Sequence, residues 1–281
     1  MGTMKVCVTG ASGKLGRATT ADLLSHGYEV IAVDTVGAAD LGVPLLRADI
    51  TDYGQTVEVL NEVEAVVHLA NIPASGLFTP SVTFTHNTAM NSNVFLAAAQ
   101  VGLQKVVWAS SETTLGLPFD TPPQYAPIDE DHFPLPTSTY ALSKVVGELV
   151  AHHISAWSGI PFIGLRFSNI HTESDYRPVP GYWRDPTLRK WNLWGYVDAR
   201  DAAMACRLAL EQTLDGAHSF IVAAADTIMN RPSAQLLDEV FPGVKLTREV
   251  AEFETLLSIN AAREALGFEP QHSWRHHVSV Q

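Results

Sequence analysis

The stretch Val6-Cys7-Val8-Thr9-Gly10-Ala11-Ser12-Gly13-Lys14-Leu15-Gly16 places a glycine-rich turn between a short apolar run and a helical pattern. Gly10 permits a tight turn, Gly13 lets the backbone approach a pyrophosphate, and Gly16 lets the next helix pack close to a sheet. The helix start offers unpaired N–H groups and a positive dipole end to phosphate. The alternative is a glycine turn without a ligand. The pattern predicts a dinucleotide-binding turn whose contacts are Gly10, Ser12, Gly13, Lys14, Leu15 and Gly16.

An acidic residue, Asp34, ends the next predicted strand at residues 30–33. A carboxylate at this point accepts hydrogen bonds from both adenosine ribose hydroxyls and repels a 2′-phosphate. The following Thr35-Val36 contains no arginine to compensate, although Lys14 and Arg17 lie nearby in the sequence. The sequence therefore predicts NAD as the cofactor in preference to NADP.

Asp49 and Ile50 follow the third predicted strand, Leu45-Leu46, and suit a contact with the adenine edge. The equal alternative is an ordinary helix start that is capped by Thr51 or Asp52. Both interpretations stay open at this point.

Further apolar runs alternate with helical patterns along the chain. They lack polar alternation, which is typical of parallel strands that are buried on both faces. Strand and helix repeated in this order predict an α/β fold with a doubly wound parallel sheet. The expected strands are residues 6–8, 30–33, 45–46, 65–69, 106–108, 162–165 and 219–223, and the expected helices are 15–24, 51–60, 82–100, 139–157 and 197–211.

The pattern changes after Asn169, where residues 177–194 are rich in Pro, Trp, Arg and Gly and are predicted to form a loop. We expect a Rossmann domain over residues 1–170, to which residues 196–225 return. A small C-terminal substrate lobe would consist of residues 171–195 and 226–281.

The composition excludes several classes of protein. Hydrophobic residues make up 46% of the 281 residues and charged residues 17%, which is typical of a globular protein rather than a disordered one. The formal net charge of -12 argues against a nucleic-acid partner, because phosphate backbones require clustered Lys and Arg. No apolar stretch is long enough to cross a bilayer, so no membrane association is expected.

The two cysteines, Cys7 and Cys206, lie in an apolar run and in a helical pattern. They are predicted to be buried thiols of a cytoplasmic protein rather than a disulfide. The histidines show no zinc-like spacing, so the sequence predicts no metal site.

Tyr140 and Lys144 stand four residues apart at the start of a predicted helix and therefore share one face. A free phenol has a pKa near 10, and a neighbouring ammonium is expected to lower that value. Tyr140 would then exchange a proton with a substrate hydroxyl or carbonyl, while Lys144 could also hold the nicotinamide ribose. Chance explains an isolated Tyr-x-x-x-Lys, but its place after the fifth strand of a dinucleotide fold favours catalysis.

A hydroxyl group is expected as the third catalytic member, at the end of the fifth strand. Ser111 lies there, at the sheet edge where ligands of open α/β sheets bind, with Ser110 and Thr113 as alternatives. Its hydroxyl can donate to the substrate oxygen as charge develops. The competing interpretation is a serine that only caps a turn.

Taken together, these motifs resemble the extended short-chain dehydrogenase/reductase superfamily, often called the NAD-dependent epimerase/dehydratase family. The resemblance covers nearly the whole chain and implies the Ser111, Tyr140 and Lys144 triad and an NAD cofactor. The matching segments are residues 9–16 for TGxxGxxG, Asp34, His68-Leu69-Ala70, residues 110–116, Tyr140 with Lys144, residues 165–169 for LRxxN, residues 197–203 for VDxRDxA and residues 266–270 for LGFxP.

The resemblance also implies cofactor contacts by Leu69, Ala70 and Asn87, and substrate contacts by Glu112 and Asn169. The chain departs from the family in three places. Ile170-His171-Thr172 stands where Tyr-Gly-Pro is common, residues 87–91 lack the usual Gly-Thr, and Leu115 replaces a tyrosine that many nucleotide-sugar epimerases carry. These departures weaken the transfer of a nucleotide-sugar substrate to this chain.

The substrate segment, residues 170–196, is shorter than its counterpart in the nucleotide-sugar epimerases, which suggests a smaller substrate. In its length and in Ser174-Asp175-Tyr176-Arg177 the chain is similar to the uronate dehydrogenases, which oxidise free sugar acids. That similarity implies that Arg177 clamps a carboxylate. An exposed loop or a subunit contact is the alternative.

The leading hypothesis is an NAD-dependent dehydrogenase that acts on a sugar or sugar acid. The second is a nucleotide-sugar 4-epimerase or dehydratase that retains NAD. Glu112 makes a dehydratase worth naming, although the usual Asp-Glu pair is absent. A catalytically silent NAD-binding regulator is the third, and the intact triad argues against it. The resemblance also implies a homodimer, formed through the helices expected at residues 82–100 and 139–157.

Overall fold

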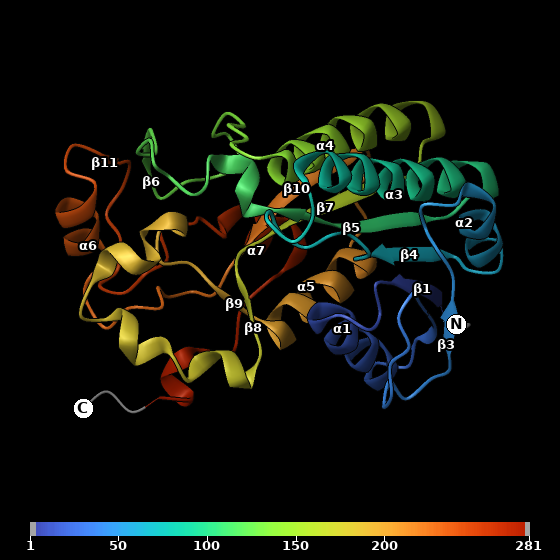
Figure 1. Cartoon of the computed structure of the whole chain (residues 1–281), viewed down its shortest axis with the longest axis horizontal. Helices are drawn as coiled ribbons and strands as arrows, with labels where there is room; N and C mark the ends of the chain where they lie inside the picture. The colour runs from blue at the N-terminus through green and yellow to red at the C-terminus, as the bar shows by residue number, and fades with distance from the viewer. Residues whose placement is uncertain (1–3, 279–281) are drawn as a thin grey trace.

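The computed structural model describes residues 4–278 and shows a three-layer α/β/α architecture around one large sheet (Figure 1). The seven strands pair in the order β10-β7-β5-β4-β1-β2-β3, and every pairing is parallel. The predicted doubly wound parallel sheet is therefore confirmed. The strands are β1 (Lys5–Thr9), β2 (Glu29–Asp34), β3 (Leu45–Arg47), β4 (Ala65–His68), β5 (Lys105–Ser111), β7 (Phe162–Phe167) and β10 (Ala217–Val222).

Helices cover both faces of the sheet and enclose two apolar cores. One core packs Trp108 and Phe162 of the sheet against Phe95 of a covering helix, and all three side chains are buried. The opposite core contains Val8, Ile163 and many other residues. Figure 1 shows α3 and α4 side by side on one face, and α1 and α5 on the other. The helices are α1 (Lys14–Ser25), α2 (Tyr53–Leu60), α3 (Pro80–Val101), α4 (Thr139–Ser158) and α5 (Ala199–Glu211).

The strand order reverses beside β1. The chain runs outward from β1 to β2 and β3, and then returns to place β4 on the other side of β1. In open α/β sheets the crevice at such a switch point, at the carboxyl ends of the strands, binds the ligand. The fold therefore places a ligand crevice between the turns that follow β1 and β4.

The segment that was predicted as a loop at residues 177–194 instead forms short 3-10 helices. At the start of η4, for example, Pro186 occupies the first helical position and Asp185 accepts a hydrogen bond from the Thr187 N–H. The smaller elements are β6 (Tyr125–Ala126), β8 (Ile170–His171), β9 (Val197–Asp198), β11 (Lys245–Leu246), α6 (Ser233–Val240), α7 (Asn260–Leu266), η1 (Glu112–Leu115), η2 (Glu173–Tyr176), η3 (Val179–Tyr182), η4 (Pro186–Asn192) and η5 (Trp274–His276).

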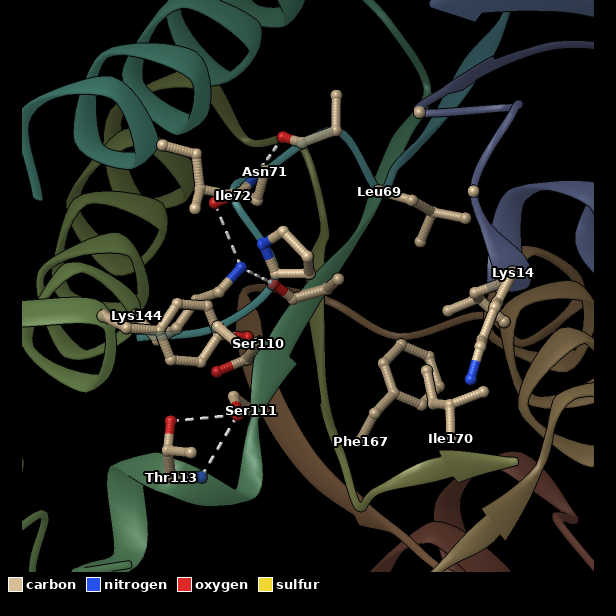
Figure 2. Close-up of a pocket in the computed structure, with 18 of the residues that line it drawn as sticks. Lys14, Leu69, Asn71, Ile72, Ser110, Ser111, Thr113, Lys144, Phe167 and Ile170 are labelled. Atoms are coloured by element: carbon tan, nitrogen blue, oxygen red, sulfur yellow. Dashed lines mark hydrogen bonds between the residues drawn. The ribbon is translucent and has the colours of Figure 1, made fainter. Parts of the chain in front are cut away.

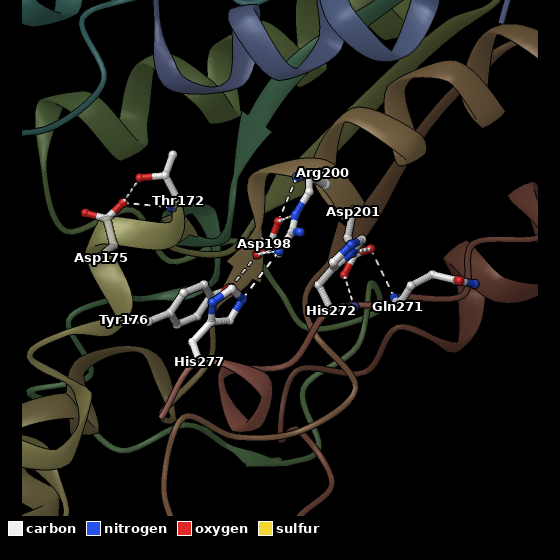
Figure 3. A network of polar contacts seen from close by, with 9 residues as sticks. All are labelled: Thr172, Asp175, Tyr176, Asp198, Arg200, Asp201, Gln271, His272 and His277. Atoms are coloured by element: carbon white, nitrogen blue, oxygen red, sulfur yellow. Dashed lines mark hydrogen bonds and ion pairs between the residues drawn. The ribbon is translucent and has the colours of Figure 1, made fainter. Parts of the chain in front are cut away.

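The VDxRDxA segment has a structural role at the start of α5. Asp198 caps α5 and also accepts a hydrogen bond of 2.8 Å from the Tyr176 hydroxyl. Asp201 accepts hydrogen bonds from the backbone N–H groups of Gln271 and His272, at 3.0 and 2.9 Å. Figure 3 shows how these two carboxylates tie η2 and the C-terminal segment to α5.

Both cysteines are buried free thiols, as predicted. Among residues 4–278, no helix combines the length and apolar character that a membrane crossing requires.

Candidate functional site

A cavity of about 980 Å³ opens at the carboxyl edge of the sheet, at the switch point. Segments that follow β1, β2, β4, β5 and β7 all contribute to its lining, together with the start of α4. Figure 2 shows Lys14 on one side of this cavity and Ser111 with Lys144 on the other. The cavity is therefore long enough to bring the glycine turn and the predicted catalytic residues into one site.

The glycine turn forms a tight cradle at one end of the cavity. Gly10 has a φ of +70, and a Cβ there would lie 2.7 Å from the backbone nitrogen of Ala70. A Cβ on Gly16 would lie 2.1 Å from the Gly10 carbonyl oxygen. Gly13, the N-cap of α1, lines the cavity together with the first residues of the helix, and no side chain caps the first N–H groups, so they are available to a ligand. This cradle fits the pyrophosphate of a dinucleotide.

Asp34 lies at the cavity wall with its carboxylate oriented by two backbone groups. Its Oδ2 accepts from the Ser12 N–H at 3.0 Å, and its Oδ1 accepts from the Val36 N–H at 3.1 Å. A carboxylate keeps further lone pairs for ribose hydroxyls after accepting these bonds. Ser12 itself supports Asp34 and does not line the cavity.

Lys14 and Arg17, the two cations near the glycine turn, are engaged elsewhere, and Arg47, which pairs in register with Asp34 between β2 and β3, donates to the Thr35 carbonyl oxygen at 2.8 Å. Lys14 pairs with Asp175 of η2 at 2.7 Å, and Arg17 donates to the carbonyl oxygens of Ser12 and Ala39 at 3.0 and 2.9 Å. A 2′-phosphate beside Asp34 would have to break these contacts, which adds to the preference for NAD.

Asp49 and Ile50 also line the cavity. The cap of α2 is Asp52, which accepts from the Gln55 N–H at 2.9 Å. Asp49 accepts instead from both the N–H and the hydroxyl of Thr51. The helix-cap alternative therefore applies to Asp52, and Asp49 remains available to the adenine end of a cofactor.

Leu69 and Ala70 line the cavity after β4, as the resemblance implied, whereas Asn87 does not. The buried Asn87 side chain accepts from the Ile72 N–H at 2.8 Å and donates to the Ile72 carbonyl at 3.1 Å. Asn87 thus holds the segment that follows β4 in place and lies behind the cavity wall.

Tyr140 is half-buried at the cavity wall, within hydrogen-bonding reach of Ser111. Burial, opposed by the Ser111 hydroxyl and aided to a smaller extent by Glu112, raises the pKa of Tyr140 to about 12. The expected lowering by Lys144 is not observed, because the ammonium nitrogen lies 5.6 Å from the centre of the Tyr140 ring and is bound elsewhere.

Lys144 is nearly fully buried and donates to two acceptors. Its Nζ lies 2.7 Å from the Ala109 carbonyl oxygen and 3.1 Å from Oδ1 of Asn71 (Figure 2). Burial lowers the pKa of Lys144 to about 7. An ammonium has three N–H groups, so one donor remains for Tyr140 or for a cofactor ribose.

Asn71 was missed by the sequence analysis, although its place after β4 was a usable signal. Its amide donates to Oδ1 of Asn91 at 3.0 Å, and His68 contacts the same oxygen through Nε2 at 3.1 Å. Burial lowers the pKa of His68 to about 3, so its ring is neutral. This buried chain of polar groups links Lys144 to the end of β4.

The three candidate hydroxyls at the end of β5 have different partners. Ser110 lines the cavity, but its hydroxyl donates to Oε1 of Glu148 at 2.6 Å. The Thr113 hydroxyl donates to Ser111 Oγ at 2.9 Å, and the Thr113 N–H donates to the same oxygen at 3.2 Å. Because Ser111 Oγ accepts both bonds, its own proton is directed to Tyr140 or to a substrate oxygen. Ser111 also caps η1, so the turn-capping interpretation applies as well.

Glu112 is a buried carboxyl group at the cavity wall beside Ser111. It accepts from the Ser168 hydroxyl at 2.6 Å and from the Asn192 amide at 3.2 Å. Burial raises the pKa of Glu112 to about 7, and the hydrogen bonds oppose that rise. The site therefore contains a carboxyl group that can be neutral or charged near neutral pH.

Arg177 is exposed and is not among the cavity-lining residues, so the structure does not bring it to the other predicted site residues. Among the described residues 171–278, Trp191 alone lines the cavity. The predicted residues that do line the cavity are Gly10, Gly13, Lys14, Leu15, Gly16, Asp34, Asp49, Ile50, Leu69, Ala70, Ser111, Glu112, Tyr140, Lys144 and Asn169. Within residues 4–278, no group of His, Cys, Asp and Glu side chains has the arrangement of a metal site.

The family model of the NAD dependent epimerase/dehydratase family matches residues 6–223. The chain therefore belongs to this NAD-dependent family. Among curated relatives, the UDP-glucose 4-epimerase of Lacticaseibacillus casei is 26% identical, over 96% of this chain and 92% of the relative. The NAD-dependent glucose-6-phosphate dehydrogenase of Haloferax volcanii is 28% identical, over 63% of this chain and 74% of the relative.

A solved short-chain dehydrogenase/reductase superfamily protein from Agrobacterium tumefaciens, with bound NAD, shares the fold. Its TM-score is 0.74 at 20% identity, and the match covers 97% of this chain and 94% of that chain. The predicted resemblance to the family is thus confirmed, and the relatives include both epimerases and a dehydrogenase.

Proposed function

We propose that the protein is an NAD-dependent dehydrogenase that oxidises a hydroxyl of a free sugar or sugar acid. The observation that carries the proposal is the composition of the cavity wall. A nucleotide sugar would require a second surface for its nucleoside diphosphate, and residues 171–278 contribute only Trp191 to the described lining. A cavity of about 980 Å³ must also accommodate the dinucleotide, which favours a small substrate.

Ser111, Tyr140 and Lys144 are the proposed catalytic residues. Bound NAD would supply the hydride acceptor, on the cradle formed by the turn of Gly10, Gly13 and Gly16. Tyr140 takes the proton of the substrate hydroxyl, and Ser111 donates a hydrogen bond to the same oxygen. Lys144 is held in position by its hydrogen bond to Asn71, and its remaining N–H group is directed toward the site.

The protonation state of Tyr140 determines how the rate of the reaction depends on pH. Because burial raises the pKa of Tyr140 to about 12, the neutral phenol predominates near neutral pH. A neutral phenol is ready to give a proton to a carbonyl, whereas hydroxyl oxidation requires the phenolate. Oxidation is therefore expected to become faster as the pH rises.

A nucleotide-sugar 4-epimerase or dehydratase with retained NAD is the second candidate. The observation in its favour is that several curated relatives that align with nearly the whole chain are UDP-glucose 4-epimerases. Glu112, beside Ser111, also provides a carboxyl group that can act as an acid in a dehydratase.

We also propose a homodimer formed through α3 and α4. Leu96 of α3 and Leu142, Leu149 and Trp157 of α4 are large apolar side chains that are exposed to solvent in the single chain. The spacing of seven or eight residues in α4 places these side chains on one helix face. Burial of this face against a second copy would remove it from water.

The proposed function is tested by following reduced-nicotinamide absorbance with excess NAD and a panel of uronic acids, free aldoses and nucleotide sugars. A steady rise with a free sugar or sugar acid supports the dehydrogenase. The dehydrogenase is excluded if no sugar produces a rise while a nucleotide sugar is converted to its epimer in the same samples.

A further inference from the structure

A chain of hydrogen-bonded polar side chains leads from the end of β1 to Lys144. It starts at Thr9, which is fully buried. The Thr9 hydroxyl oxygen accepts from the backbone N–H groups of Leu69 and Ala70, at 3.2 and 3.3 Å. Because its lone pairs face these N–H groups, the hydroxyl proton is directed to Nδ1 of His68, which lies 2.7 Å away.

The direction of the next hydrogen bond follows from the protonation of His68. Burial lowers the pKa of His68 to about 3, so the ring is neutral and carries one N–H group. Since Nδ1 accepts from Thr9, that N–H group is on Nε2, which donates to Oδ1 of Asn91 at 3.1 Å. Asn91 is itself buried, and a Cβ added to Gly147 of α4 would lie 2.9 Å from its Nδ2. The Asn91 amide is thus held with its oxygen toward His68.

Asn91 in turn determines the orientation of the Asn71 amide. Nδ2 of Asn71 donates to Oδ1 of Asn91 at 3.0 Å and also to the Ala70 carbonyl oxygen. The Asn71 oxygen is therefore the end that faces Nζ of Lys144, at 3.1 Å. In the reversed orientation the NH2 group of Asn71 would face the ammonium and its oxygen would face the oxygen of Asn91, and both contacts would be repulsive.

Lys144 requires such acceptors because it is only 1% exposed. Burial disfavours the charged form and lowers the pKa of Lys144 to about 7, whereas hydrogen bonds to the ammonium favour the charged form. The two acceptors are the Ala109 carbonyl oxygen at 2.7 Å and Oδ1 of Asn71 at 3.1 Å. An ammonium group is tetrahedral, so two N–H groups that are held by acceptors also fix the direction of the third.

Charged and titratable groups act on Lys144 directly or through its neighbours on α4. These groups are Tyr140 and Glu148 of α4, His68 of β4, Arg166 of β7 and Glu112 of η1. Glu148 raises the pKa of Lys144 and is itself paired with Arg166 at 2.9 Å. Glu112 acts on Tyr140, and the neutral His68 adds no charge. Asn71 is therefore an uncharged acceptor that can be exchanged without breaking an ion pair.

We propose that Asn71 is a positioning residue that acts through Lys144, because its oriented oxygen favours the protonated form of the buried lysine and leaves the third N–H group for Tyr140 or a cofactor ribose. Thr9, His68 and Asn91 fix the orientation of Asn71 from the end of β1. This inference rests on the proposed function, since Lys144 is one of the proposed catalytic residues. It extends the site to a chain of side chains behind the cavity wall.

The test measures the pKa of Lys144 by NMR, in the full chain isotope-labelled at the lysine ε carbons. The Lys144 signal is identified by its absence from Lys144→Met. The variants are Asn71→Leu, Asn71→Asp, His68→Leu and the double variant with leucine at both positions. Asn61→Leu is the matched control, because Asn61 is exposed at the end of α2. The measurement requires no substrate and is therefore independent of the reaction that the protein catalyses.

The two substitutions of Asn71 should shift the pKa of Lys144 in opposite directions. Asn71→Leu removes one hydrogen bond to a charged group, so the pKa should fall by about one pH unit. Asn71→Asp keeps the shape but places a carboxylate beside the ammonium, so the pKa should rise by about one pH unit or more. His68→Leu frees the Asn71 amide and should cause a smaller fall, and the double variant should match Asn71→Leu because His68 acts through Asn71. Asn61→Leu should leave the pKa unchanged.

Shifts in the same direction in Asn71→Leu and Asn71→Asp, or no shift in either, would overturn the inference. Additive shifts in the double variant would also overturn it, since His68 would then act on Lys144 independently. If Asn71→Leu does not fold, Asn71→Asp is sufficient, because loss of structure alone does not raise the pKa of a buried lysine. The expected shifts without oxidation of any sugar would refute the proposed dehydrogenase and leave this inference standing. Oxidation of a sugar with an unchanged Lys144 pKa in both Asn71 variants would refute this inference alone.

Discussion

Alanine substitutions at Gly16 and Gly13 should separate two roles of the glycine turn. A Cβ on Gly16 would lie 2.1 Å from the Gly10 carbonyl oxygen and 2.7 Å from the Ala11 Cα, both of them backbone atoms. Ordinary contacts begin near 3.4 Å, so α1 would have to move by about 1.3 Å. That movement is close to the rise of about 1.5 Å per helical residue.

Because backbone atoms cannot rotate away as a side chain does, Gly16→Ala should reach the upper end of overpacking costs. We expect the free energy of unfolding to fall by about 3 kcal/mol. The displaced helix start should also weaken NAD binding by at least about tenfold.

Gly13→Ala should give a different result. Its added Cβ meets only the Gly10 carbonyl oxygen, at 3.3 Å, and otherwise lies at the cavity wall. The free energy of unfolding should fall by about 1 kcal/mol or less, because no packed side chain is displaced and the remaining cost is that of alanine at a helix N-cap. NAD affinity should nevertheless fall by about tenfold or more, since the methyl group occupies the place of the pyrophosphate.

Urea unfolding and calorimetric titration with NAD measure the two quantities. Gly181→Ala is the matched control, because nothing lies within 4 Å of its added Cβ and its φ is not positive. It should leave stability and NAD affinity unchanged. Equal destabilisation by Gly13→Ala and Gly16→Ala, or unchanged NAD affinity in Gly13→Ala, would refute the reasoning.

The remaining predictions concern catalysis, cofactor choice, pH and assembly. Tyr140→Phe should lower the turnover number by about 10²–10⁴-fold with NAD affinity intact, and wild-type turnover in rate assays would contradict its role. Asp34→Ala should weaken NAD more than NADP in calorimetric titrations, whereas equal losses would exclude the ribose contact. The rate of hydroxyl oxidation should rise between pH 7 and 9, because burial raises the pKa of Tyr140 to about 12 and more phenolate forms as the pH rises. An initial rate that does not change with pH would count against Tyr140 as the base. Burial raises the pKa of Glu112 from 4.5 to about 7, so wild-type stability should decline relative to Glu112→Gln as the pH rises through that window, by up to about 3 kcal/mol in urea unfolding. Leu149→Asp should convert a dimer to a monomer in sedimentation experiments, and a monomeric wild-type protein would exclude the proposed interface.

The cofactor preference illustrates how local and distant contacts combine. Asp34 suffices to predict NAD from the sequence, because its place at a strand end is a local feature. The structure adds that Lys14 and Arg17, which could have softened this preference, are bound to Asp175 and to backbone carbonyls.

The proposed catalytic serine shows what the structure adds to a local pattern. The sequence favours Ser111, with Ser110 and Thr113 as alternatives at the end of the same strand. The structure adds the hydrogen-bond partners of the two alternatives, since Ser110 is bound to Glu148, 38 residues away, and Thr113 donates to Ser111.

The sequence by itself determined the parallel α/β sheet, the glycine turn and the Tyr140–Lys144 spacing. These features depend on residue types at short separations: alternation of strands and helices, glycine conformation and the helical period. Such signals depend on neighbouring residues and can therefore be recognised in the sequence alone.

Only the tertiary structure decided the polar partners and the protonation of the site. Lys144 meets Asn71 across 73 residues, and Asn169 meets Arg189 across 20. Arg177 and Arg189 lie in the same segment, but packing leaves the first in water and buries the second. Burial also reversed the expected direction of the Tyr140 pKa shift. Desolvation and long-range hydrogen bonds depend on which distant residues surround a group, and that arrangement exists only once the chain has folded.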